Sequence, residues 1–180
     1  MKILTTERLI LRGWEESDCL DLYEYASNEL VGPNAGWPAH KNHEESQSII
    51  KMFIQSEDTY AIVLKSENKV IGSIGMHNRT PDESLKDLNQ REIGYVLNPK
   101  YWGSGYIPEA VMCLIKYGFE QMKLDIVWCG HYDFNEKSKR VVEKCGFHYR
   151  FNRDVTLNLL GDKVVNEWFY SIFKNEYCEN

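Results

Sequence analysis

The spacing of hydrophobic residues changes several times along the chain, and each change predicts a new element. Alternation over residues 6–12 predicts a first strand. Apolar residues at helical spacing then predict two helices, one capped at Ser17 or Asp18 and one opening at Asn42. The segment 31–38 between them is rich in glycine and proline and predicts a loop.

The rest of the pattern predicts mostly strands. Two β-rich runs around a polar turn form a predicted hairpin, and two further strands flank a long helix. A short helix follows, and then two antiparallel strands joined by a II′ turn at Gly161-Asp162. The predicted bounds are 60–65 and 69–77 for the first hairpin, 90–98 and 124–132 for the flanking strands, 106–123 and 135–144 for the helices, and 148–160 and 164–173 for the last pair.

This order of elements predicts the fold class. It reads β-α-α-β-β-β-α-β-α-β-β, which gives an α/β fold with a mixed sheet, mostly antiparallel, and one strand–helix–strand crossover in the middle. We find no internal repeat and no linker, and 180 residues suit one domain. We therefore expect a single domain over 1–180.

Composition and charge exclude several classes of protein. With 43% hydrophobic and 27% charged residues the chain is no disordered or low-complexity polymer. A formal charge of -6 argues against a nucleic-acid-binding surface and favours cationic partners such as amines. No apolar run approaches the roughly 20 residues that span a bilayer, and the first eight residues hold no signal-peptide core. We expect no membrane partner.

The five cysteines form no Cys-x-x-Cys and are widely spaced. A disulfide framework or a zinc site is therefore not expected, and a reducing cytoplasm is the natural compartment. His40, His43 and Glu44 do not form a His-Glu-x-x-His motif, so we expect no metal.

The residues from 91 to 110 carry the clearest chemistry, because a strand, a glycine-containing turn and a long helix follow one another there. Gly103 and Gly105 allow the backbone to approach a bulky phosphate. The unpaired N–H groups of a helix start attract anions, and Lys100 adds a positive charge. The segment is therefore typical of a pyrophosphate site, although a lone Gly-x-Gly is also found in ordinary turns.

Two other phosphate-binding motifs fit less well. A dinucleotide-binding fold would use Asp125, twenty residues after Gly105, but Pro108 stands where its third glycine belongs. Asp125 also lies at the start of its strand, whereas the ribose-binding acid of such a fold should lie at the end of a strand. A Walker loop fails because no Gly-Lys-Ser/Thr follows the turn.

The hexapeptide Lys100-Tyr101-Trp102-Gly103-Ser104-Gly105 resembles the acyl-coenzyme-A motif of the Gcn5-related N-acetyltransferases (GNAT), Gln/Arg-x-x-Gly-x-Gly/Ala, with lysine in the first place. Residues 135–147 resemble the family's Asn-x-x-Ser/Ala…Gly-Phe helix. The opening 6–12 and the strand from Glu92 resemble the RimJ/RimL-like branch. The resemblance covers about 6–173 and implies a sheet in which two central strands, beginning near Glu92 and Leu124, splay apart.

The resemblance also implies a co-substrate and a reaction. Acetyl-CoA would lie between the splayed strands and acetylate a primary amine, either a protein N-terminus or a small molecule, by direct attack. Relatives are monomers or homodimers. The implied coenzyme contacts are Tyr95, Val96, Leu97, Lys100, Trp102, Gly103, Ser104, Gly105, Tyr106, Ile107, Asn135 and Ser138.

A base must remove a proton from the attacking ammonium. Glu92, on the first splayed strand, is the first candidate, because burial would raise its pKa toward neutrality. Other members carry a glutamate five residues before the asparagine, where this chain has Gly130. His131 and Tyr132, at the end of the same strand, are possible substitutes. Glu92 could instead be a surface carboxylate paired with Arg91 or with a lysine.

The leaving thiolate needs a proton, and here the chain departs from much of the family. Many members carry a tyrosine where Val142 stands, and Ser138 is the RimL-like alternative. Trp37, in the loop 31–38, is predicted to form a wall of the acceptor site beside Glu92. Because Val142 and Gly130 replace reactive groups, a non-catalytic acyl-CoA-binding module on the same fold is the alternative function.

Overall fold

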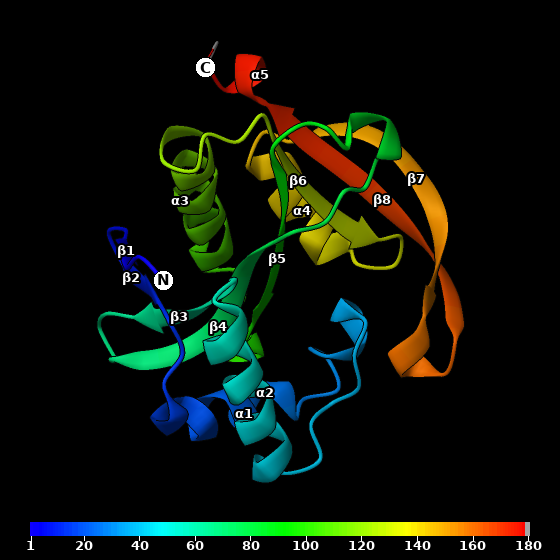
Figure 1. Cartoon of the computed structure of the whole chain (residues 1–180). Coiled ribbons are helices and arrows are strands. Elements are labelled where there is room, and N and C mark those ends of the chain that lie inside the picture. The colour runs from blue at the N-terminus through cyan, green and yellow to red at the C-terminus, as the bar shows by residue number, and fades with distance from the viewer. Residues whose placement is uncertain (179–180) are drawn as a thin grey trace.

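An eight-stranded sheet runs through the computed structural model, which describes residues 1–178 (Figure 1). Its strand order is β1-β2-β3-β4-β5-β6-β8-β7, and every neighbouring pair is antiparallel except β5 and β6. This confirms the predicted mixed sheet. The strands are β1 Leu4–Thr5, β2 Leu9–Arg12, β3 Thr59–Leu64, β4 Lys69–His77, β5 Gln90–Leu97, β6 Ile126–Tyr132, β7 His148–Leu157 and β8 Lys163–Phe173.

Helices pack on both faces of the sheet and divide the core in two. Side chains of α3 and α4 join one large apolar cluster with the sheet, and side chains of α1 and α2 join a second. We call these the α3–α4 face and the α1–α2 face. The helices are α1 Cys19–Ala26, α2 His43–Ser56, α3 Tyr106–Glu120, α4 Glu136–Lys144 and α5 Lys174–Cys178. Among the described residues, no helix combines the length and the apolar character needed to cross a bilayer.

The two predicted helix caps have different outcomes. Asn42 caps α2 as predicted, since its side chain accepts a hydrogen bond of 2.9 Å from the Glu45 amide. Asp18 makes no side-chain cap to α1. Its carboxylate instead pairs with Arg12 at 2.7 Å, because an arginine fork outweighs a single backbone N–H as a partner for a buried carboxylate.

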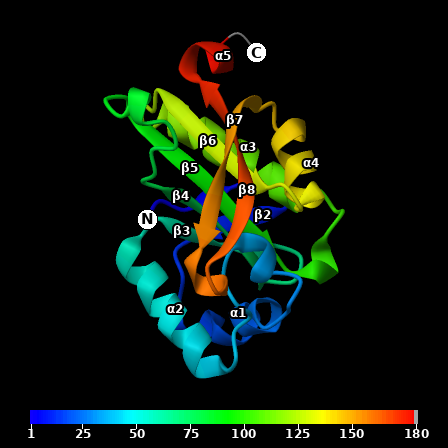
Figure 2. The same ribbon diagram turned by 90° about the vertical axis from the view of Figure 1, so that its right-hand side faces the viewer.

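The closing hairpin differs from the prediction. Strand β7 ends at Leu157, and a short 3₁₀ turn precedes Gly161. Both Gly161 (φ 69°) and Asp162 (φ 57°) have left-handed backbone, whereas a II′ turn has positive φ only at its first central residue. The predicted II′ turn is therefore wrong, and the connection is longer. The hairpin tip lies beside the segment between α1 and α2 (Figure 2), where a Cβ on Gly36 would lie 3.6 Å from Leu157.

Strands β5 and β6 pair only over their first halves. The pairing runs from Gln90 opposite Ile126 to Ile93 opposite Cys129, after which β5 continues beside β4 and β6 beside β8. The predicted splay is therefore present and begins after Ile93. Because side chains alternate along a strand, Glu92 lies on the α1–α2 face and Ile93 on the α3–α4 face, within the larger core.

Candidate functional site

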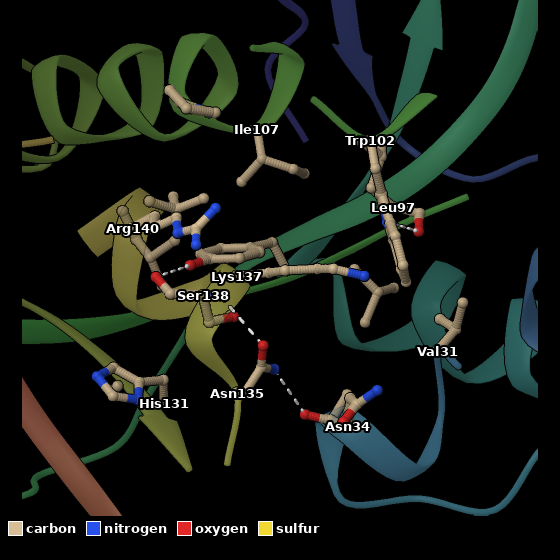
Figure 3. A pocket seen from close by; sticks show the side chains of 18 of the residues that line it. Val31, Asn34, Leu97, Trp102, Ile107, His131, Asn135, Lys137, Ser138 and Arg140 are labelled. Carbon is tan, nitrogen blue, oxygen red and sulfur yellow. Dashed lines mark hydrogen bonds between the residues drawn. The ribbon is translucent and has the colours of Figure 1, made fainter. Parts of the chain in front are cut away.

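A pocket of about 670 Å³ lies where β5 and β6 separate. Its walls are β5, β6, the start of α3, α4 and the segment between α1 and α2, and Glu167 of β8 closes one end. Figure 3 shows side chains from these elements converging on the cavity. A cavity of this size accommodates a large organic ligand.

The start of α3 forms one wall of the pocket. Gly103 and Gly105 both have φ near 79°, and α3 begins at Tyr106 with no side-chain cap on its first amides. A Cβ on Gly103 would meet no heavy atom within 4 Å. The turn is therefore an open backbone surface whose N–H groups find no partner within residues 1–178, which is the arrangement that binds anions.

An arginine from the start of the chain holds this turn in place. Arg8 Nη1 donates to the Ser104 carbonyl at 2.9 Å, and Arg8 Nη2 lies 2.6 Å from Oε2 of Glu109. The guanidinium also lies 4.5 Å from the ring centroid of Tyr106. Ser104 is fixed through its carbonyl, while Gly103, Gly105, Tyr106 and Ile107 line the pocket.

Lys100 is directed elsewhere. Its Nζ lies 2.8 Å from Oε1 of Glu24, and hydrogen bonds from Lys100 and Lys69 lower the pKa of Glu24 to about 2. The charge that the sequence assigned to a phosphate is therefore engaged with a carboxylate of α1. Positive charge in the pocket comes from other residues.

Three cations of α4 line the pocket, and sequence reasoning missed them. Lys137, Arg140 and Lys144 are spaced by three and four residues, so they share one helix face. Lys137 Nζ lies 3.4 Å from the ring centroid of Trp102, whose Nε1 donates to the Leu97 carbonyl at 2.9 Å (Figure 3). The spacing of these three residues could have identified a cationic helix face from the sequence alone.

The start of α4 joins the two sides of the pocket. The Asn135 side chain caps α4 by accepting from the Ser138 amide at 3.1 Å, and its Nδ2 donates to the Asn34 carbonyl at 3.1 Å (Figure 3). The Tyr95 hydroxyl donates to the Ser138 carbonyl at 3.3 Å, and burial raises the pKa of Tyr95 well above its usual value. The Ser138 side chain also interacts with the Tyr95 hydroxyl, which opposes part of that rise in pKa, and Ser138 lines the pocket.

Glu92 lies at the other side of the pocket, on the α1–α2 face. It is 6% exposed, and its Oε2 lies 3.0 Å from Nη1 of Arg79. Arg79 also bonds Glu167 at 2.9 Å, so one guanidinium bridges two buried carboxylates. Burial raises the pKa of Glu92, the Arg79 charge opposes that rise and Glu167 adds to it. The expected raised pKa is confirmed, but the partner is Arg79 and not Arg91.

His131 and Tyr132 lie on opposite faces of β6 because they are neighbours in a strand. His131 is buried, with Nδ1 2.9 Å from the Tyr132 carbonyl and Nε2 3.3 Å from the Tyr170 hydroxyl. Both of its nitrogens are therefore engaged. Tyr132 shares the α1–α2 face with Glu167, its partner in register, and burial raises the pKa of Tyr132.

Trp37 lies away from the pocket lining. Its ring packs against Gly32 and lies 5.3 Å from the His40 ring, within the α1–α2 core. The segment between α1 and α2 does border the pocket, but through Leu30, Val31, Asn34 and Ala35. The sequence therefore located a segment that borders the pocket, but Trp37 itself packs against the α1–α2 core and does not line this pocket.

Sequence reasoning also missed Arg79, Glu167 and His77, which all line the pocket. Arg79 and His77 flank the start of a polar, irregular segment, and Glu167 belongs to a strand far along the chain. Among the described residues, no three His, Cys, Asp or Glu side chains come together as a metal-binding group.

Comparisons with known proteins agree with this geometry. A family model described as an acetyltransferase (GNAT) domain matches residues 8–148. A Bacillus subtilis (strain 168) protein named as an uncharacterized N-acetyltransferase, YnaD, is 26% identical over 176 residues, which cover 97% of this chain and 98% of that protein. The crystal structure of a GNAT-family acetyltransferase from Bacillus anthracis has a TM-score of 0.86 at 27% identity, covering 97% of this chain and 100% of that one.

A more distant structure shares the fold. The microcin C7 self-immunity acetyltransferase MccE, solved in complex with acetyl-CoA and AMP, has a TM-score of 0.74 at 20% identity and covers 93% of each chain. Because the family model matches most of the chain, and because this match agrees with the splayed sheet and the glycine turn, the protein belongs to the acetyltransferase (GNAT) family and is an acyl-CoA-dependent N-acetyltransferase.

Proposed function

We propose that the protein transfers an acetyl group from acetyl-CoA to a primary amine, carried by a small molecule or a protein N-terminus, by direct attack in a ternary complex. One observation carries the proposal. A single pocket joins an open glycine turn and three cations on one side to a buried carboxylate on the other. The first side suits a polyanionic coenzyme, and the second suits an ammonium.

The residues present fit the coenzyme. The amides around Gly103 and Gly105 are free to hold a pyrophosphate, and Lys137 and Arg140 add positive charge nearby. Beyond Ile93 the edge of β5 that faces β6 has no strand partner. Backbone groups on this edge near Tyr95 can therefore pair with the amides of a pantetheine arm, whereas the Val96 carbonyl faces Gly72 of β4 and the Leu97 carbonyl already accepts from Trp102. The bound coenzyme supplies the acetyl group as a thioester.

Glu92 is the proposed base. Its carboxylate accepts a proton from the ammonium, which leaves a neutral amine with a lone pair for attack. A pKa raised by burial makes the carboxylate a stronger base than an exposed glutamate. Arg79 holds the carboxylate in one orientation, and Glu167 keeps that end of the pocket negative.

Ser138 is the proposed partner of the leaving thiolate. Its hydroxyl can donate a hydrogen bond to sulfur, and the helix cap from Asn135 fixes its backbone. Val142 is fully buried in the core and has no proton to give. Tyr132 is a second hydroxyl on the opposite face of the splayed strands, within the same pocket.

The acceptor site favours a cation. Two buried carboxylates face one guanidinium there, so one negative charge remains for an ammonium.

The described cysteines are all free thiols, which suits the reducing cytoplasm.

An acceptor screen tests the function. The purified protein is mixed with acetyl-CoA and with N-terminal peptides, polyamines, amino acids or aminoglycosides, and free thiol is measured together with the mass of the acceptor. We expect thiol release that depends on an acceptor and an acceptor heavier by one acetyl group. Tight acetyl-CoA binding with no acceptor-dependent release would favour a non-catalytic binding module, and thermal stabilisation by NAD(H) alone would favour a dinucleotide enzyme.

A further inference from the structure

His77 lies directly beside Glu92. It is the last residue of β4, and the antiparallel register places it opposite Glu92 on β5. Opposite residues in such a pair share one face, with Cβ atoms about 4.5–5.5 Å apart. The imidazole and the carboxylate therefore lie side by side on the α1–α2 face, and both line the pocket.

A carboxylate outside the pocket orients the imidazole. His77 Nδ1 lies 3.1 Å from Oδ2 of Asp58, just before β3. The other oxygen, Oδ1, accepts from the hydroxyls of Ser56 at 2.8 Å and Thr59 at 2.9 Å. Burial opposes ionisation of Asp58, but these hydrogen bonds outweigh it and lower its pKa. An ionised Asp58 favours the tautomer with hydrogen on Nδ1, which leaves the lone pair on Nε2.

Two glycines make room for the ring. A Cβ on Gly75 would lie 2.6 Å from His77 Nε2, and a Cβ on Gly94 would lie 3.3 Å from the same atom. Gly94 is the first residue of β5 beyond its last pair with β6. Nε2 therefore lies over the point where the strands separate and the pocket opens.

We propose that His77 is the proton outlet of the site. The idea rests on the proposed function and on Glu92 as base. An N–H bond of the ammonium breaks as an O–H bond forms on Glu92; that O–H bond then breaks as an N–H bond forms on His77 Nε2, directly or through one water. His77 finally releases the proton to solvent. Glu92 is 6% exposed, whereas the His77 side chain is 42% exposed, so the imidazole connects a buried base with water.

Several charged or titratable groups face this imidazole. Asp58 contacts Nδ1, and Glu92 lies across the strand pair. Arg79 follows two residues later, with its amide donating to the His77 carbonyl, and bridges to Glu167 of β8. Tyr132 of β6 lines the same pocket. Because imidazoles exchange protons with water near neutral pH, His77 is the member of this group suited to an outlet.

Chemical rescue tests the proposal. His77→Ala should lower turnover at pH 7 by about 10²-fold, the lower end of what proton-transfer groups contribute, without changing the KM for acetyl-CoA. Added imidazole should restore turnover in proportion to its concentration, because it can enter the vacated, half-exposed site. His148→Ala, which removes an exposed imidazole from β7, should match the unaltered protein and show no imidazole effect.

Further variants separate the outcomes. Asp58→Asn should cost less than His77→Ala, and imidazole should not rescue it because the ring still fills the site. Glu92→Gln should not respond to imidazole. Full turnover in His77→Ala, or a loss that imidazole fails to restore and that accompanies a lower melting temperature, would overturn the proposal. A failure of the underlying function is distinct, because the unaltered protein would then show no acceptor-dependent thiol release.

Discussion

Arg79 Nη1 lies 3.0 Å from Oε2 of Glu92, although that carboxylate is 6% exposed and raised in pKa. The guanidinium attracts the ionised form, while burial disfavours it and is the larger effect. The same arginine is shared with Glu167, so its charge is divided between two carboxylates. This division explains how Glu92 keeps a basic carboxylate beside a permanent cation.

Glu92→Gln should lower turnover at neutral pH by about 10²–10⁴-fold, the usual contribution of a general base. The amide keeps the shape of the side chain and should leave acetyl-CoA binding unchanged. Part of the loss should be recovered at high pH, where more of the acceptor is already a neutral amine. Steady-state rates across pH 6–10 check this, with exposed Glu44→Gln on α2 as the control. A nearly full rate at pH 7 would remove Glu92 from the role of base.

Glu92→Gln should also change how the melting temperature of the protein depends on pH. The folded pKa of Glu92 is raised, so the folded state binds a proton more tightly than the unfolded state does. Its stabilising contribution is present at low pH and is lost as the pH rises through the folded pKa. Glu92→Gln should therefore melt no lower than the unaltered protein at pH 7, and any gain should disappear as the pH falls toward 4. A lower melting temperature at pH 7 would mean that the ion pair with Arg79 outweighs the burial of the charge.

Gly105→Asp should abolish the rise in melting temperature that acetyl-CoA produces. The new side chain would begin 3.6 Å from Arg8 Nη2 and add a negative charge to the turn that the pyrophosphate is proposed to approach. A ligand at 100 times its Kd normally stabilises by about 2.7 kcal/mol. Gly161→Asp is a matched control, since Gly161 also has a left-handed backbone, φ 69° against 79°, but lies in the β7–β8 connection. Equal acetyl-CoA shifts in both variants would place the phosphate elsewhere.

Periodicity predicted the order from β2 to β8, and residue types predicted the glycine turn, because both depend on residues close together in sequence. The short elements β1 and α5 were missed, and the first strand begins at Leu9 and not at Thr6. Periodicity could not show which face of the sheet a pocket side chain occupies, because that depends on how strands far apart in sequence pair. His131 and Tyr132 both line the pocket, but the strand places them on opposite faces, and only Tyr132 shares the face of Glu92.

Arg79 is a pocket residue that the sequence analysis did not identify. It lies in an irregular polar segment that carries no periodic signal, and its partner Glu167 is 88 residues away. Lys100 was assigned to a phosphate because of its place in the motif, yet Glu24 of α1 engages it. Long-range ion pairs of this kind follow from the packing of whole elements and leave no local pattern.

Arg140→Ala should weaken acetyl-CoA binding about tenfold or more, since hydrogen bonds to charged groups are worth about 1.5–3 kcal/mol. The loss should shrink as salt rises, because screening already weakens the attraction. Lys139→Ala removes a neighbouring cation that does not line the pocket and is the control. Titration calorimetry at two salt concentrations measures both. Equal losses would indicate a general charge effect of α4.

Glu109→Gln should make the protein less stable at neutral pH by about 1.5–3 kcal/mol, the value of hydrogen bonds to a charged group. Burial opposes ionisation of Glu109, but hydrogen bonds from Thr6 and Arg8 outweigh it and lower its pKa. Because the folded pKa is depressed, this stability is present above the unfolded pKa, near 4.3, and is lost as the pH falls through the folded value. Denaturant unfolding at pH 7 and at pH 3 should show the difference between variant and parent shrinking in acid.

Ser138→Ala should lower turnover less than Glu92→Gln. It removes one hydrogen bond to a thiolate that can also take a proton from water, whereas the ammonium must lose its proton before attack. The loss should persist at high pH, since a more neutral amine does not help a leaving thiolate. The fold should be kept, because the α4 cap uses the Ser138 amide and the Tyr95 hydroxyl retains its hydrogen bond to the Ser138 carbonyl when the side-chain contact is lost.

Tyr132→Phe provides the comparison, because Tyr132 is another hydroxyl that lines the pocket and lies on the opposite face of the splayed strands. If Ser138 serves the thiolate, Ser138→Ala should be impaired at pH 7 and pH 9 alike while Tyr132→Phe stays near the parental rate. The reverse order would transfer the role to Tyr132. Turnover measured at both pH values with a saturating acceptor decides between them, because the hydroxyl that meets the sulfur must lie on the side of the strands where the coenzyme thiol leaves.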